Sequence, residues 1–233
     1  MRKFILILML LAALAAGLSS LPLRWAAGFI GPSADKAALA FGGNLWNGFA
    51  SLPDGNGYVD IKTRPLSIVK GQLPMAFKTR GTPFVAAGRA GWGRMSEVRI
   101  SAPLQALVKR DARLYGLSGN TVMTVSDLDL RGECSASGTV VVDDIAMDYP
   151  GWKWQGPQMS GPIVCKEGVM IFDLSGKQAG DDIRLRLGVD RQGGYDVQLS
   201  FSTRELGAEA ALPLMGFENR SGVWTLVEKG RWQ

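Results

Sequence analysis

The sequence predicts a mainly β fold. Glycine is the compositional outlier, at 30 of 233 residues, and it separates short apolar runs as tight turns between strands do. Apolar and polar residues alternate with a period of two over residues 183–189 and 195–201. The segment between these runs, DRQGG, is typical of a hairpin turn. We therefore expect an antiparallel curved sheet, an open barrel or a sandwich.

Weaker strand patterns recur at short spacing along the rest of the chain. They cover residues 49–52, 57–62, 72–79, 84–91, 97–101, 122–130, 139–145, 169–174 and 224–228. Two short helical inserts are expected between strands. One covers residues 103–110, with Pro103 at the first helical position, and the other covers residues 203–212 and ends at Pro213.

An apolar segment near the N-terminus predicts a transmembrane helix. Arg2 and Lys3 precede a run over residues 4–23, and 20 apolar residues match a hydrocarbon core about 30 Å thick. By the positive-inside rule, residues 1–3 form a cytoplasmic tip and the following chain is exported. A cleaved signal peptide is the alternative, with a site at Ala13-Leu14-Ala15. We favour an uncleaved anchor because the apolar run continues past that site, and both interpretations export the bulk of the chain.

The exported part divides into a linker and one folded domain. Residues 24–40 are expected to form a linker with a short helix, and residues 41–233 a periplasmic β domain. The predicted location is the cell inner membrane, with a single span and the C-terminal domain in the periplasm. Cys134 and Cys165 suit this oxidising compartment and most simply form a disulfide. Two buried free thiols are the alternative.

Composition and motifs give no support for catalysis. The chain has no histidine, which removes the usual general base and the commonest metal ligand. Ser67 and Lys70 fit the S-x-x-K pattern of acyl-enzymes, but a proline and a glycine beside them exclude the helix that this chemistry needs. The adjacent acids at 143–144 and 181–182 point to opposite faces of a strand. We expect no catalytic residue, no metal and no cofactor. Basic residues are scattered, so nucleic-acid binding is not expected either.

Three tryptophans are candidate partner-binding residues. Trp152 and Trp154 have the same strand parity and therefore lie on one face. Together with Trp46 they can form an aromatic anchor for a partner. The alternative is that they fill the core of a glycine-rich sheet, because aromatic side chains bury large areas in cores as well as in interfaces.

Several small motifs resemble those of a known family. Residues 21–25 read LPLRW, residues 42–48 read GGNLWNG, close to the family's G-t-l-W-x-G, and residues 128–134 read LDLRGEC. Cys165 follows Gly161, and the C-terminal part holds Gly216-Phe217, Trp224, Gly230 and Trp232. These features resemble type II secretion system protein N, an inner-membrane component of the machine that moves folded proteins across the outer membrane.

This resemblance implies a non-catalytic subunit with one membrane span. Its periplasmic domain is expected to contact other assembly-platform proteins or the secretin. The family has no catalytic residues to carry over, and the matching positions look structural: Gly43, Trp46, Gly48, Cys134 and Cys165.

A lipid-handling protein is the alternative function. In such a protein, similar to the AsmA-like group, a membrane-anchored curved sheet offers an apolar face as a groove for acyl chains. This alternative predicts an apolar face that no helix or second sheet covers.

Overall fold

The computed structural model describes residues 41–44, 46–51, 57–64, 67, 70–91, 93–108, 114, 116–129, 134–205 and 207–231. The predicted transmembrane helix over 4–23 and the linker over 24–40 lie outside these residues. Within the described part of the chain, no helix has both the length and the apolar character needed to span a membrane.

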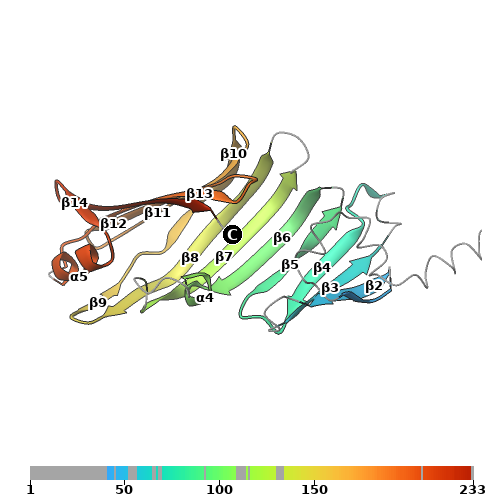
Figure 1. The fold of residues 1–233 in the computed structure, drawn as a ribbon, viewed down its shortest axis with the longest axis horizontal. Coiled ribbons are helices and arrows are strands. Elements are labelled where there is room, and N and C mark those ends of the chain that lie inside the picture. Colours follow the sequence, from blue (N-terminus) through green and yellow to red (C-terminus); the bar gives the residue numbers. More distant parts are fainter. Residues whose placement is uncertain are drawn as a thin grey trace, which may run out of the picture. The chain divides into compact units, whose positions relative to one another are not determined.

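The described strands form one antiparallel sheet of 15 strands, which confirms the predicted mainly β fold (Figure 1). Neighbouring strands follow the order of the sequence, except that β9 pairs with β8 and β14 pairs with the outer side of β15. The order is linear and does not close on itself, with β1 at one end and β14 at the other. Of the three architectures considered, an open single sheet is therefore the one that these residues form.

The chain divides into two compact units. Of the described residues, unit 1 comprises those from 41 to 82 with Ala87–Gly91, and unit 2 comprises Pro83–Ala86 with those from 93 to 231. Unit 1 is a meander in which each strand pairs with the next. Its strands are β1 (Phe41–Gly43), β2 (Asn47–Ser51), β3 (Tyr58–Thr63), β4 (Met75–Arg80) and the larger part of β5 (Val85–Gly91).

Unit 2 contains the longest strands and both described helices. Its elements are β6 (Arg94–Pro103), α4 (Leu104–Val108), β7 (Leu117–Asp129), β8 (Ser135–Tyr149), β9 (Trp152–Gln155), β10 (Met159–Lys166), β11 (Val169–Gln178), β12 (Asp181–Val189), β13 (Gly194–Ser202), α5 (Ala208–Leu214), β14 (Glu218–Arg220) and β15 (Val223–Arg231). Figure 1 shows α5 at the same end of the sheet as β9 and β14.

The strongest prediction, the hairpin of β12 and β13, is confirmed. Residues 183–189 pair with residues 195–201 in register, so that Ile183 faces Phe201 and Leu185 faces Leu199. The carboxylate of Asp190 accepts hydrogen bonds from the N–H groups of Gln192 and Gly194 at 2.7 and 2.8 Å, which holds the turn.

Both helical inserts exist, with corrected bounds. The first begins at Leu104 because Pro103 still belongs to the ladder of β6 and β7. The second begins at Ala208, since the Thr203 hydroxyl accepts the N–H of Glu205 in a turn that precedes the helix. Pro213 lies inside this helix rather than ending it. A proline is tolerated there because the helix has only seven residues and ends at the next residue, Leu214.

Strand β10 was not predicted, since Gly161 and Pro162 in its middle read as a turn. Pro162 keeps its place opposite Thr139 of β8, but the ladder to β11 is interrupted at these two residues. The interruption accommodates the missing proline N–H. Position 161 accepts only glycine, because a Cβ there would lie 1.8 Å from the backbone oxygen of Asp173.

Candidate functional site

One face of unit 2 carries a continuous row of apolar side chains. Across neighbouring strands, Phe172 faces Leu187, which faces Val197, and Leu185 faces Leu199, which faces Leu226. We call these six residues the apolar strip. They come from β11, β12, β13 and β15, and all six are only half-buried. The same face holds fully buried residues further along the strands, among them Ile183 and Phe201.

The buried end of this face is covered by α5 and the two tryptophans of β9. Trp152 and Trp154 stack with ring centroids 5.9 Å apart, and Trp154 meets Phe201 edge-on at 5.0 Å. Ala208, Ala211 and Leu212 of helix α5 are buried, and Gly207 before the helix packs against Trp152. The apolar strip lies beyond this cover, toward the β12–β13 turn. The lipid-handling alternative predicts an apolar face that no helix covers, and only the apolar strip meets that description here.

The three candidate partner-binding tryptophans occupy different environments. Trp152 and Trp154 are 5% and 9% exposed in the core of unit 2, and Trp46 is half-buried in unit 1. The Nε1 atom of Trp154 donates a hydrogen bond of 2.7 Å to the Asp181 carboxylate. The Nε1 atoms of Trp46 and Trp152 have no hydrogen-bond partner among the described residues. Partner binding by this trio therefore stays a prediction.

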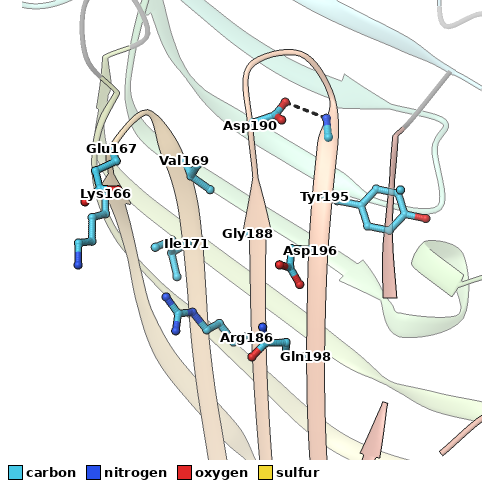
Figure 2. A pocket seen from close by; sticks show the side chains of 12 residues that line it. Lys166, Glu167, Val169, Ile171, Arg186, Gly188, Asp190, Tyr195, Asp196 and Gln198 are labelled. Carbon is cyan, nitrogen blue, oxygen red and sulfur yellow. Dashed lines mark hydrogen bonds between the residues drawn. The ribbon is translucent and has the colours of Figure 1, made fainter. Parts of the chain in front are cut away.

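The opposite face of unit 2 is hollowed near the β12–β13 turn (Figure 2). The hollow has a volume of about 630 Å³. Its floor is open because Gly188 has no side chain, and a Cβ there would lie 3.3 Å from Val169. Arg186 on β12 and Gln198 on β13 face each other across the ladder and line it.

The hollow carries charges of both signs. Asp190 is engaged by the backbone of its turn, and the Asp196 carboxylate lies 2.8 Å from the Lys229 ammonium group. Lys166 and Arg186 make no ion pair with the described residues. Glu167 also lines the hollow and makes no ion pair with them either, so the acids of the hollow match its cations once Lys229 is counted.

The adjacent acids point to opposite faces, as expected. Asp181 accepts the Trp154 indole N–H, whereas Asp182 lies 2.8 Å from the Lys177 ammonium group and 3.4 Å from Arg184. The hydrogen bond from Lys177 holds the pKa of Asp182 below its ordinary value. Each acid thus supports local structure, and the two do not share a site.

The S-x-x-K motif is built into a backbone turn. The Ser67 hydroxyl is buried and lies 2.7 Å from the carbonyl oxygen of Arg64 and 3.1 Å from that of Leu73. Lys70 is exposed. A serine whose hydroxyl is held by backbone carbonyls is engaged in structure and lacks the arrangement of an activated nucleophile.

The glycine and tryptophan motif over residues 42–48 forms the hairpin between β1 and β2. Gly43 has a φ of +81°, and a Cβ there would lie 2.4 Å from the carbonyl oxygen of Asn47. The Asn44 side chain accepts the N–H groups of Trp46 and Asn47 at 3.1 and 2.8 Å. The motif is therefore explained by a tight turn that only glycine and asparagine build at low cost.

Cys134 and Cys165 form the predicted disulfide. It joins the residue before β8 to the end of β10, across a sequence separation of 31 residues. Both ends belong to the part of unit 2 that carries the β8–β10 ladder.

Comparison with known proteins gives one match. A family model described as type II secretion system (T2SS), protein N, matches residues 38–227, which is most of the chain. The chain belongs to this family. The resemblance inferred from the motifs is confirmed. No curated protein and no solved structure matches the chain.

Family membership makes this chain a component of the type II secretion system and implies interaction with other components. The matched region includes the hairpin motif, the disulfide, the aromatic cluster and all strands of unit 2 up to most of β15. The apolar strip and the hollow are features that sequence motifs did not reveal. Alternation predicted which residues share a face of one strand, but only the register shows which of them adjoin on neighbouring strands.

Proposed function

We propose that this protein is a non-catalytic, single-span inner-membrane subunit of the type II secretion system. In this proposal, its periplasmic β domain bridges assembly-platform proteins and the secretin during export across the outer membrane. The observation that carries the proposal is the family match over residues 38–227. The apolar segment over 4–23 and the disulfide between Cys134 and Cys165 support an exported domain tethered to a membrane.

Protease accessibility tests the proposed topology. In cells with a permeabilised outer membrane, added protease should digest the β domain while a cytoplasmic marker protein stays intact. The measurement is an immunoblot against the C-terminal part of the chain. Digestion that occurs only after the inner membrane has been lysed would contradict the proposal.

Copurification tests the proposed bridging role. Affinity purification of the full chain from solubilised membranes should recover other type II secretion components. Cells that lack the protein should export less of the secretion substrates. Recovery equal to that from an untagged control, together with unchanged export, would exclude a bridging subunit.

A second candidate function is binding of lipid acyl chains. The observation that favours it is the apolar strip, whose six half-buried side chains lie beyond the cover provided by α5. Their burial against an acyl chain would be favourable by about 25 cal/mol per Å² of apolar surface removed from water. This function does not compete with membership of the secretion system, because one subunit can do both.

Lipid extraction from detergent-purified protein tests this second function. Mass spectrometry should detect acyl species in the wild type, and the variant Leu199→Glu should lose most of them, because a carboxylate on the strip opposes burial of a hydrocarbon. Ser200→Glu is the matched control, since residue 200 adjoins Leu199 on β13 but lies on the other face, opposite Arg184. Equal lipid content in the two variants, at equal melting temperature, would rule out binding at the strip.

A further inference from the structure

Strand β15 has a free edge in the described part of the chain. Strand β14 pairs only with Val223, Trp224 and Thr225, whereas β15 continues to Arg231. On its other side, β15 pairs with β13 along nearly its whole length, from Trp224 to Arg231. From Leu226 onward, no described strand therefore lies on the side away from β13.

The hairpin turn identifies the backbone groups that this edge presents. Ser221 and Gly222 have φ values of 55° and 85°, the conformation of a two-residue turn of type I′. The flanking residues Arg220 and Val223 then form a hydrogen-bonded pair, so that the N–H and C=O groups of Val223 point toward β14.

The backbone N–H and C=O groups point to the same side of the strand at every second residue. This alternation directs the N–H and C=O groups of Val227, Lys229 and Arg231 outward, where they have no described strand partner. The edge thus presents three donors and three acceptors at a spacing of about 6.7 Å between successive residues of the row.

Side chains along this edge favour an acidic, partly apolar partner. Val227 is 62% exposed, and Lys229 and Arg231 lie on the same face of β15. The Lys229 ammonium group already lies 2.8 Å from the Asp196 carboxylate, whereas Arg231 donates a hydrogen bond of 3.1 Å to the side-chain oxygen of Gln192 and makes no ion pair with described residues. The face of the edge that carries Val227 therefore holds two cations, Lys229 and Arg231, against one acid, Asp196.

A second copy of this chain is a poor occupant. Two β15 edges that pair antiparallel about Lys229 would place the two lysines directly opposite each other. A shift in one direction would bring Lys229 opposite Arg231, and a shift in the other direction would bring the two Glu228 residues opposite each other. Like charges at directly opposite positions destabilise a strand pair, so this edge disfavours self-association. A partner strand with carboxylates at these positions would instead place opposite charges across from each other, which stabilises the strand pair.

We infer that the free edge of β15 is a strand-addition site for an extended acidic segment of a partner protein. The added strand lies antiparallel to β15, in line with β14, and places carboxylates near Lys229 and Arg231 and an apolar side chain against Val227. This inference rests on the proposed bridging function and assigns a surface to it.

The test uses the full chain in membranes, with a photo-crosslinking amino acid at position 227. Wild-type background should give adducts with another secretion component. Lys229→Glu combined with Arg231→Glu should reduce the adduct yield about fivefold or more, as expected when charge-assisted contacts are lost. The matched control is Arg220→Glu, which reverses an exposed arginine on β14, outside the free edge. It should leave the yield unchanged.

Copurification with two substitutions at one position separates the backbone from the side chain. Val227→Pro removes an outward N–H and should lower partner recovery, whereas Val227→Thr retains the N–H and should keep most of it. The inward ladder to β13 does not use this N–H, and melting temperatures check that both variants fold.

The outcomes distinguish this inference from the bridging proposal. If wild type recovers secretion components but the Glu and Pro variants recover them equally well, bridging stands and the edge is not the site. Adducts between two copies of the chain at position 227 would overturn the inference in favour of self-pairing. If wild type recovers no component, the bridging proposal fails.

Discussion

Replacing Trp154 with alanine is expected to lower the free energy of unfolding by about 3–5 kcal/mol. The ring is 9% exposed, stacks on Trp152 and meets Phe201 edge-on. Truncation leaves a cavity beside Trp152 and Phe201 and removes the donor to the Asp181 carboxylate. Equilibrium denaturation of the purified protein measures the loss.

Two further variants show whether the effect belongs to the buried ring. Trp154→Phe keeps an aromatic ring but lacks the indole N–H, so it should lose less stability than the alanine variant. Lys153→Ala alters the neighbouring side chain, which is 84% exposed, and should change stability by less than about 0.5 kcal/mol. A stable Trp154→Ala protein that no longer recovers its partners would instead support the predicted aromatic anchor.

Replacing Cys134 with serine is expected to lower the melting temperature of the non-reduced protein by about 10 °C. A loop closed over about 30 residues stabilises a fold by roughly 3–4 kcal/mol in the chain-entropy model. The bridge joins Cys134 to Cys165, and it links the ends of two strands that already pair with each other. Thermal unfolding with and without reductant measures the effect.

The reduced proteins are the internal control for this experiment. Under reducing conditions, wild type and Cys134→Ser should melt at nearly the same temperature. Cys165→Ser and the double variant should match Cys134→Ser, because either substitution removes the same bond. Wild type and variant that melt together before reduction would show that the bridge does not contribute to stability.

Local patterns predicted the parts of the fold that depend on neighbouring residues. The β12–β13 hairpin follows from two alternating runs around an Asp-led turn, since strand parity and turn chemistry are properties of short segments. The hairpin over residues 42–48 is similar, because Gly43 and Asn44 build the turn themselves. The disulfide was predicted because the chain has two cysteines and is expected in an oxidising compartment, and no geometric argument was needed.

The errors arise where tertiary contacts override local signals. Strand β10 was missed since Gly161 and Pro162 break the strand pattern, yet pairing with β8 holds them in an extended ladder. Helix α5 begins later than predicted, as the turn at Thr203 takes the position that its capping pattern suggested for the helix start.

Composition, periodicity and small motifs were enough to indicate an antiparallel β protein, its disulfide and its family, since each of these depends on residue types and short spacing. The surfaces on which function depends came from the folded arrangement alone. The apolar strip needs the register of four strands, and the contact between Trp154 and Asp181 joins residues 27 positions apart. The free edge of β15 exists because β14 stops after three residues, and pairing between distant strands is not encoded in the pattern of either strand.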